Sequence, residues 1–351
     1  MTDRSKCHSN FFSNLNKCYL IAEIGVNHNG DITLAKEMIR AAKTSGADAV
    51  KFQTFKAERL VSEGTPKVNY QKSTTSPDES HYEMIRKLEL SEQDHIILKE
   101  FCDEVGIEFM STPYDIESAR FLHEIIGVKL FKTASADVVD LPLQRYIAST
   151  GKPSVVSVGM ATLAEVESVC EIYKHEQNSN LVLLHCVSNY PCADESLNLR
   201  VMDTLRQAFQ VSVGYSDHSN GCVAAVLSIA YGACVIEKHF TLDKSLAGPD
   251  HLASSTPEEF AFLAESIRRA EVMLGSSVKA CQPEEQQMAL VSRKSIVLGK
   301  SVNSGETIEE GDLVLKRPGS GLLSSELTKV IGRKATKNLS KNHRLMLGDF
   351  E

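Results

Sequence analysis

Short apolar runs and longer amphipathic stretches alternate along most of the chain. The short runs are rich in β-branched and aromatic residues, which is typical of β-strands. Several of them, such as Val182-Leu183-Leu184, contain no polar residue, which indicates parallel strands covered on both faces. Eight strands are predicted, at approximately Cys18–Glu23, Ala49–Gln53, Glu108–Met110, Lys129–Lys132, Ser154–Ser157, Leu181–His185, Val211–Gly214 and Cys234–Lys238.

Between these runs, apolar residues recur at the spacing of an α-helix. Strands that alternate with helices predict a parallel sheet with right-handed crossovers. Eight such units favour a closed (β/α)₈ TIM barrel of the α/β class, with an open, doubly wound sheet as the alternative. The predicted helices are Thr33–Ser45, Glu92–Val105, Ser118–Ile126, Leu141–Ala148, Leu163–Tyr173, Leu197–Phe209, Val223–Tyr231 and Pro257–Met273.

The pattern changes near Val278–Gln287, a polar stretch that contains Pro283. Beyond it, short apolar runs are separated by glycine and charged turns, and no long amphipathic helix is predicted. We therefore expect a barrel over residues 1–278, a linker over 279–292 and a small domain of short strands over 293–351.

One connection, from Phe55 to about Leu88, is much longer than the others. Connections of this length in compact domains are usually binding loops, lids or disordered segments. Because it follows a predicted strand, we interpret it as a substrate lid, with disorder as the alternative.

Composition and charge exclude several classes of protein. The net charge of −8 and the isoelectric point near 5.8 argue against nucleic-acid binding, which requires a basic face. The nine cysteines include no CxxC pair and are expected to be reduced thiols. No apolar secretory segment is visible at the start, and the longest apolar run, Cys222–Ile236, is too short to span a membrane, so a cytoplasmic protein is expected.

In a barrel of this class, the chemistry lies at the carboxyl ends of the strands. His218 and His239 end two neighbouring predicted strands, which would lie about 5 Å apart. Two such imidazoles can share one divalent ion, Mn²⁺, Mg²⁺, Zn²⁺ or Co²⁺, and leave coordination positions open for substrate. The alternative is a pair of core histidines that bind no metal.

An anion site is predicted from two lysines at strand ends, Lys51 and Lys132. Lysine and hydroxyl groups together hold phosphate and carboxylate through charge-assisted hydrogen bonds. The alternatives are structural ion pairs with Glu23 or Asp137, and a lysine that forms a Schiff base with a carbonyl substrate. The hydroxyl residues expected beside the lysines are Ser111, Thr112, Ser135 and Ser157.

Carboxylates and sugar-binding groups complete the predicted site. Glu23 and Asp137 end predicted strands and could act as general acid and base, or form structural ion pairs. Gln53 and Tyr190 are suited to hydrogen bonds with a sugar, and Asp250 follows the tight turn of Gly248-Pro249 near the expected pocket mouth.

Taken together, these strand ends resemble the sialic acid synthase family over nearly the whole chain. The fold that the resemblance implies is a TIM barrel with a small carboxyl-terminal antifreeze-like (SAF) domain. The segments that carry the resemblance are AEIGVNHNGD (22–31), AVKFQTFKAERL (49–60), MSTPYD (110–115), FKTASAD (131–137), SVGMAT (157–162), LLHCVSNYP (183–191), GYSDH (214–218), EKHFTLDK (237–244), GPDH (248–251) and KRPGSG (316–321).

The resemblance implies a transferase that condenses phosphoenolpyruvate with an open-chain N-acetylmannosamine-type sugar. The products would be a nine-carbon 2-keto acid and phosphate. His218 and His239 would bind the metal, with Mn²⁺ favoured over Mg²⁺ or Co²⁺, and Glu23 would transfer protons while Asp137 orients water. Phosphoenolpyruvate would contact Lys51, Lys132, Thr112, Ser135 and Ser157; further substrate contacts would be Gln53, Ser111, Ser188, Tyr190, Ser216, Asp250 and Arg317.

The same resemblance implies a domain-swapped homodimer. In the family, the SAF domain places one arginine over the active site of the partner subunit, and Arg317 is the matching residue here.

Three positions depart from the common family pattern. Asp137 replaces the usual glutamate in Ala134-Ser135-Ala136-Asp137, Val158 replaces a hydroxyl residue, and Ser188 replaces the asparagine of some members. The segment FQTFKAERL is similar to both N-acetylneuraminate and N,N'-diacetyllegionaminate synthases. We favour N-acetylneuraminate as the product; the alternatives are the legionaminate synthase, which uses 2,4-diacetamido-2,4,6-trideoxymannose, and more remotely a Schiff-base aldolase.

Overall fold

The computed structural model describes residues 11–12, 16–62, 64–67 and 79–351. The chain divides into two compact units, Met1–Gly275 and Ser276–Glu351. Of the long connection predicted between Phe55 and Leu88, residues 63 and 68–78 lie outside the described part.

The first unit is built on eight parallel strands in the order β3-β2-β1-β8-β7-β6-β5-β4. The two ends of this order, β3 and β4, pack against each other, so the sheet closes into a barrel. The predicted (β/α)₈ fold is confirmed. The strands are β1 (Tyr19–Gly25), β2 (Ala49–Thr54), β3 (Glu108–Pro113), β4 (Phe131–Thr133), β5 (Ser154–Ser157), β6 (Leu181–His185), β7 (Ser212–Asp217) and β8 (Val235–His239).

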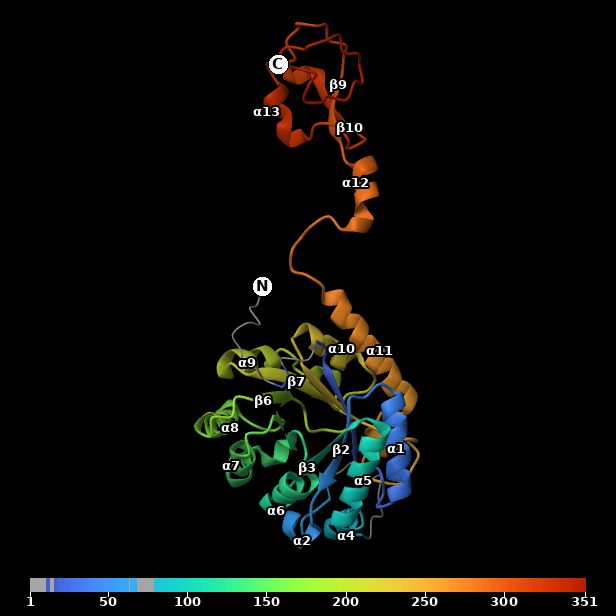
Figure 1. The fold of residues 1–351 in the computed structure, drawn as a ribbon, viewed down its shortest axis with the longest axis vertical. Helices are drawn as coiled ribbons and strands as arrows, with labels where there is room; N and C mark the ends of the chain where they lie inside the picture. Colours follow the sequence, from blue (N-terminus) through green and yellow to red (C-terminus); the bar gives the residue numbers. More distant parts are fainter. Residues whose placement is uncertain (1–10, 13–15, 63, 68–78) are drawn as a thin grey trace. The chain divides into compact units, whose positions relative to one another are not determined.

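Helices surround the strands (Figure 1). Side chains of Asp31, Ser91, Thr162 and Thr256 accept hydrogen bonds from the first turns of four of them, which explains where these helices begin. None of the helices in the described ranges is long and apolar enough to cross a membrane. The helices are α1 (Ile32–Thr44), α5 (Glu92–Val105), α6 (Ile116–Arg120) continued by the π-helix η2 (Phe121–Ile126), α7 (Leu141–Ser149), α8 (Leu163–His175), α9 (Val201–Phe209), α10 (Val223–Ala230) and α11 (Pro257–Leu274).

The interior of the barrel is apolar near the amino-terminal ends of the strands and polar near their carboxyl ends. Successive side chains of a strand point to opposite faces, so Tyr19 and Ile21 share the interior face of β1 with Glu23. The interior positions near the strand starts belong to one apolar cluster, which includes Ala49 and Val182. Phe12, only 2% exposed, packs against this cluster. The polar groups further along each strand therefore stand on an apolar base.

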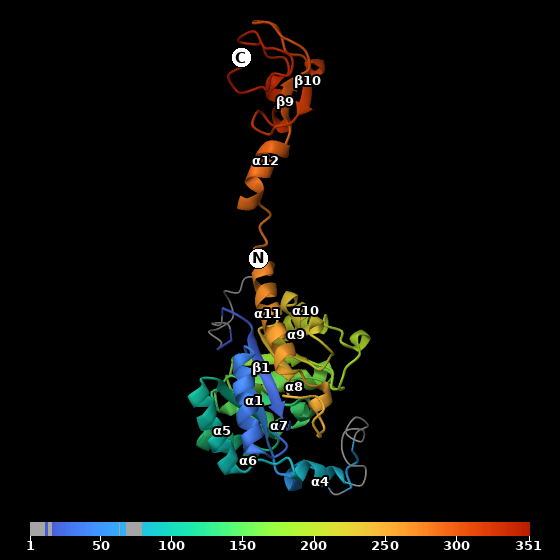
Figure 2. The ribbon, with the colours of Figure 1, turned by 90° about the vertical axis from the view of Figure 1, so that its right-hand side faces the viewer.

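The connection between β2 and α5 contains two short helices, α2 (Ala57–Leu60) and α4 (His81–Arg86). In two views at right angles, α4 lies at the end of the barrel toward which the arrows of β1 and β2 point (Figures 1 and 2). The described part of this connection therefore borders the carboxyl ends of the strands.

The second unit has its own small core. Strand β9 (Ser295–Leu298) pairs antiparallel with β10 (Leu313–Lys316), and Ile296 and Leu298 pack with Val302 and Leu345. The helices of this unit are short, α12 (Gln286–Ser292) and α13 (Leu327–Val330), as the absence of a long amphipathic pattern predicts.

Candidate active site

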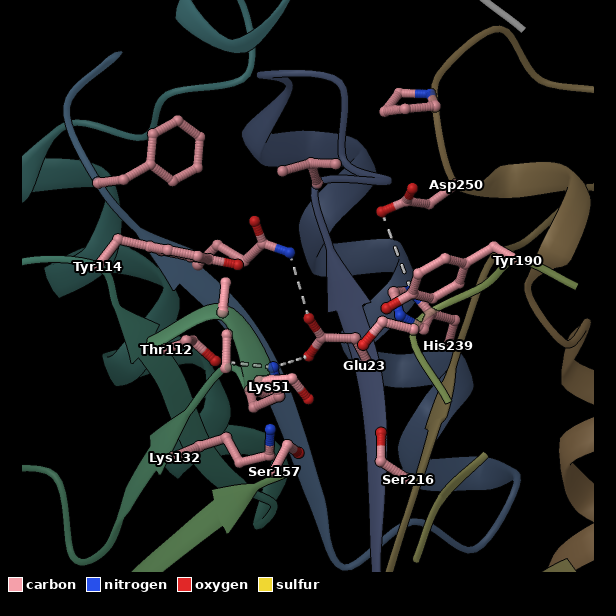
Figure 3. A pocket seen from close by; sticks show the side chains of 18 of the residues that line it. Glu23, Lys51, Thr112, Tyr114, Lys132, Ser157, Tyr190, Ser216, His239 and Asp250 are labelled. Atoms are coloured by element: carbon pink, nitrogen blue, oxygen red, sulfur yellow. Dashed lines mark hydrogen bonds and ion pairs between the residues drawn. The ribbon is translucent and has the colours of Figure 1, made fainter. Parts of the chain in front are cut away.

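A cavity of about 390 Å³ opens at the carboxyl ends of the barrel strands. Side chains from β1, β2, β3, β4, β5, β7 and β8 project into it (Figure 3). The predicted site residues that line this cavity are Glu23, Lys51, Gln53, Thr112, Lys132, Ser135, Ser157, Ser188, Tyr190, Ser216, His218, His239 and Asp250.

One end of the cavity is a buried network of two lysines and two carboxylates, Glu23, Lys51, Lys132 and Glu237, which we call the ionic end. Lys51 Nζ lies 2.5 Å from Glu23 Oε2 and 3.7 Å from Glu237 Oε2, and Lys132 Nζ lies 3.4 Å from Glu237 Oε1. Lys51 also donates to Thr112 Oγ1 at 2.8 Å. The ion pair between Lys51 and Glu23, which the sequence left open as the alternative to an anion site, is present within the cavity itself.

The pKa values of the two carboxyl groups at the ionic end are shifted in opposite directions. Burial raises the pKa of Glu23, although Lys51 opposes this shift. Burial would also raise the pKa of Glu237, but Lys132, Lys51 and a hydrogen bond from Ser216 outweigh it and hold that pKa well below its usual range. Glu23 is thus the carboxyl suited to exchanging a proton, and Glu237 the one that stays charged.

Small groups leave room for an anion beside Lys132. Ser135 Oγ accepts a hydrogen bond from the backbone N–H of Gly159 at 2.9 Å and lies 3.0 Å from Cys186 Sγ. A Cβ at Gly159 would come within 2.6 Å of Ser188 Oγ and 2.7 Å of Cys186 Sγ, so only glycine leaves this space open. The hydroxyl of Ser157 is buried and has no hydrogen-bond partner among the described residues, as expected of a group that donates to a ligand.

The two predicted metal ligands face each other. The rings of His218 and His239 have centroids 5.6 Å apart, and the ring of Tyr190 packs against both. Burial lowers the pKa of both imidazoles, and for His239 the neighbouring His218 lowers it further, which favours the neutral form that binds a cation.

The hydrogen bonds of the two rings also suit a metal. His218 Nδ1 donates to the carbonyl oxygen of Val187 at 2.7 Å, which leaves the Nε2 lone pair toward the cavity. Within the described part of the chain, His239 Nδ1 has no hydrogen-bond partner, and it lies 4.0 Å from Asp250 Oδ2. No group of three His, Cys, Asp or Glu side chains in the described ranges could hold a metal. A cation here would take two nitrogens from the protein and the rest of its ligands from substrate and water.

A second buried ion pair lies behind the histidines, on the outer face of the same strands. Lys238 Nζ lies 2.7 Å from Asp217 Oδ2 and donates to the carbonyl oxygen of Ser219 at 2.8 Å. The other oxygen of Asp217 accepts from the backbone N–H and the hydroxyl of Ser219. We call the ion pair of Asp217 and Lys238 the clamp. Because Asp217 precedes His218 and Lys238 precedes His239, the clamp fixes the two strand ends that carry the imidazoles.

Another part of the cavity is lined mainly by apolar side chains. Val26, Phe55 and Leu88 are buried together, with Leu60, Ile85 and Tyr114 packed against them, and all six line the cavity. We call these six residues the apolar wall. Four of them come from the connection between β2 and α5 or its ends, so the described part of the predicted lid forms a side of the pocket.

Three predicted site residues lie elsewhere. Ser111 points away from the cavity and bonds to Thr54 Oγ1 at 2.6 Å, because it neighbours the inward-facing Thr112 on the same strand. Asp137 sits on a 3₁₀ turn after β4 and does not line the cavity, and burial raises its pKa to about 7. Arg317 is exposed on the second unit.

The sequence prediction missed Glu237 and Tyr114. Strand alternation could have found Glu237, because His239 points inward and the residue two positions earlier must share its face. The clamp of Asp217 and Lys238 follows from the same rule applied to the opposite face. Nothing in the local pattern marked Tyr114, which lies beyond the end of β3.

Comparison with known proteins identifies the family of this chain. The NeuB family model matches residues 38–279, and the SAF domain model matches residues 293–351. The N,N'-diacetyllegionaminic acid synthase of Legionella pneumophila is 47% identical over 95% of this chain and 95% of its own length. The protein of the same name from Campylobacter jejuni is 42% identical over 93% of this chain and 98% of its own.

A solved structure supports the same assignment. The crystal structure of the N-acetylneuraminic acid (sialic acid) synthetase from Leptospira borgpetersenii, in complex with citrate, matches with a TM-score of 0.70 at 34% identity. The match covers 78% of this chain and 90% of that one. The family model covers most of the barrel unit, and the relatives extend over nearly the whole chain. The chain therefore belongs to the NeuB family, the sialic acid synthases, and is an enzyme of the transferase type with a carboxyl-terminal SAF domain.

Proposed function

We propose that this enzyme condenses phosphoenolpyruvate with open-chain 2,4-diacetamido-2,4,6-trideoxymannose to give N,N'-diacetyllegionaminic acid and phosphate. The identity of 47% and 42% to two N,N'-diacetyllegionaminic acid synthases, against 34% to the N-acetylneuraminic acid synthetase, supports this sugar. The prediction of N-acetylneuraminate as the product is less well supported than this alternative.

One observation carries the proposed reaction: two lysines and two imidazoles face the same cavity. The phosphate and carboxylate of phosphoenolpyruvate would bind Lys51 and Lys132, with hydroxyls of Thr112, Ser135 and Ser157 donating beside them. Glu23 and Glu237 form ion pairs with the two lysines. The incoming anion would therefore compete with Glu23 for Lys51.

A divalent cation held by His218 and His239, with Mn²⁺ favoured over Mg²⁺ or Co²⁺, would supply polarisation of the sugar aldehyde. The clamp of Asp217 and Lys238 would keep both imidazoles in position. Thorough removal of metal with EDTA should abolish turnover, and added Mn²⁺ should restore it. Unchanged turnover after chelation would contradict this role of the histidines.

The bonds change in two stages. C3 of phosphoenolpyruvate attacks C1 of the sugar, and the aldehyde oxygen takes a proton, for which Glu23 is suited because burial raises its pKa. Water then adds to the electron-poor C2 and loses a proton. Cleavage of the bond between C2 and the bridging oxygen releases phosphate and leaves the 2-keto acid.

The experiment is phosphate release measured with phosphoenolpyruvate labelled by ¹⁸O at the bridging oxygen. Release should require both substrates, and the label should appear in phosphate. Label retained in the keto acid, or release without sugar, would contradict the proposal. Borohydride should trap no substrate on Lys51 or Lys132; trapping would favour the Schiff-base aldolase.

We also propose that Arg317 completes the site of a second copy of the chain in a domain-swapped homodimer. Arg317 is exposed on the SAF unit, so its guanidinium is available to a ligand. Arg317→Ala should raise the KM for the sugar and leave the KM for phosphoenolpyruvate unchanged. Co-expression of Arg317→Ala and Lys132→Met chains should regain activity, because each mixed dimer would contain one intact site. No recovery in isolated mixed dimers would show that Arg317 does not act across subunits.

A further inference from the structure

The apolar wall is a separate apolar cluster within a cavity whose other end is ionic. Val26, Phe55 and Leu88 are at most 9% exposed, and they do not belong to the core between strands and helices or to the one inside the barrel. Apart from the hydroxyl of Tyr114, the side chains of the wall carry no hydrogen-bonding group. A ligand surface placed against the other five side chains must therefore be apolar to avoid unpaired polar groups.

Polar contacts on the outer side hold the wall in place. Glu89 accepts a hydrogen bond from the backbone N–H of Ala57 at 2.6 Å and forms an ion pair with Lys56 at 3.3 Å. These contacts connect the start of α2 to the chain that follows α4. A capping box of Ser80 and Glu83 fixes the start of α4. The wall is thus held by contacts within the protein itself, as a specificity subsite requires.

The wall lies away from the reacting groups. Figure 3 shows Tyr114 and Asp250 at one level of the pocket and Lys132, Ser157 and Ser216 at the opposite level, with Glu23 and Lys51 between them. The carbon that forms the new bond must lie next to phosphoenolpyruvate at the ionic end. The non-reacting end of an extended six-carbon sugar then points out of the ionic end, toward the part of the pocket that contains Tyr114.

We propose that the apolar wall determines specificity by binding the methyl groups at the non-reacting end of the sugar, foremost the methyl at C6. This inference rests on the proposed function and adds to it the residues that distinguish a 6-deoxy sugar from a 6-hydroxy sugar. A hydroxyl at C6 would lose its water against the five wall side chains that carry no hydrogen-bonding group, whereas a methyl group gains contact there. One such difference in a pocket changes kcat/KM by roughly 10- to 200-fold.

The test uses two sugars that differ by a single hydroxyl, N-acetylmannosamine and its 6-deoxy analogue. Wild-type full-length enzyme should prefer the 6-deoxy sugar by about tenfold in kcat/KM. Ile85→Thr keeps the branched shape and adds a hydroxyl to the wall, so it should remove most of this preference and leave the KM for phosphoenolpyruvate unchanged. Leu60→Thr, on the neighbouring α2, should act in the same direction.

Ile125→Thr is the matched control, because Ile125 is 63% exposed on η2 and does not line the cavity. It should change neither the sugar preference nor the KM values. If Ile85→Thr and Leu60→Thr lower kcat/KM for both sugars by the same factor, or change neither, the wall does not determine specificity.

The proposed function can fail separately. If wild-type enzyme does not use 2,4-diacetamido-2,4,6-trideoxymannose, the proposed function is wrong. A preference for the 6-deoxy sugar that Ile85→Thr removes would still establish the wall as the subsite for C6. If wild-type enzyme shows no preference for the 6-deoxy sugar, the proposed role of the wall is wrong even where the trideoxy sugar is a substrate.

Discussion

The ionic end and the apolar wall of one cavity are built in different ways. The ionic end consists of interior positions on four barrel strands, fixed by parallel register and by mutual ion pairs. The wall comes mainly from the connection between β2 and α5, whose helices α2 and α4 belong to no barrel layer. The strands thus supply groups suited to bond chemistry, and an insertion supplies a surface suited to choosing the sugar. Changes at the ionic end should stop turnover of every sugar, while changes in the wall should alter the ratio between sugars.

The largest effect is expected from Lys132→Met. This variant leaves Glu237 with only the longer pair to Lys51, and removing one partner of a buried ion pair costs about 3–5 kcal/mol. Turnover of both sugars should fall by at least about 10³-fold, since a charge-assisted contact to the phosphoester is lost. Lys129→Met is the control, because Lys129 pairs with Glu108 at the surface and its side chain is 65% exposed. Substantial activity in purified Lys132→Met would contradict the assigned role of the ionic end.

A smaller effect is expected from Lys238→Met, which breaks the clamp behind the histidines. Supporting contacts of this kind typically change metal affinity by about 10- to 100-fold. Titration of Mn²⁺ followed by electron paramagnetic resonance should show weaker binding, with the KM for phosphoenolpyruvate unchanged. Loss of thermal stability with unaltered Mn²⁺ affinity would show that the pair is structural only.

The smallest effect on activity is expected from Asp137→Asn, because Asp137 does not line the cavity. Its pKa is raised from 3.8 to about 7, first by burial and then by Asp140, so the folded state holds the proton more tightly than the unfolded state. Wild-type stability should therefore fall as the pH rises from about 4 to about 7.

Asp137→Asn should not lose stability as the pH rises, because the amide side chain does not ionise. The variant should exceed wild type by on the order of 2 kcal/mol in the free energy of unfolding at pH 8, and by less than half of that at pH 5, in urea titrations. An equal difference at both pH values would show that the carboxyl is not the cause. A large loss of turnover in Asp137→Asn would show that Asp137 takes part in the reaction.

Much of the fold follows from local pattern. The bounds of α5, β5 and β6 agree with prediction, because apolar periodicity and capping residues act over a few neighbouring residues. The packing of Phe12 against the barrel interior was not predicted, since it joins residues distant in sequence. The predicted helix Ser118–Ile126 instead begins at Ile116 and continues as the π-helix η2.

The candidate site was likewise predicted in part. Residue type at strand ends identified the lysines and the histidines, but not which face of a strand each neighbour occupies. Ser111 was placed wrongly in the cavity and Glu237 was overlooked for that one reason. The wall could not be inferred, because it depends on how α2 and α4 pack over the strands rather than on any pattern within them.

The most direct test is a competition in which wild-type enzyme receives phosphoenolpyruvate, Mn²⁺ and equal concentrations of 2,4-diacetamido-2,4,6-trideoxymannose and N-acetylmannosamine. Mass spectrometry of the early products should show mainly N,N'-diacetyllegionaminic acid, and Ile85→Thr should shift the product ratio toward N-acetylneuraminic acid. N-Acetylneuraminic acid as the main product of wild-type enzyme, with a ratio that Ile85→Thr leaves unchanged, would contradict the account.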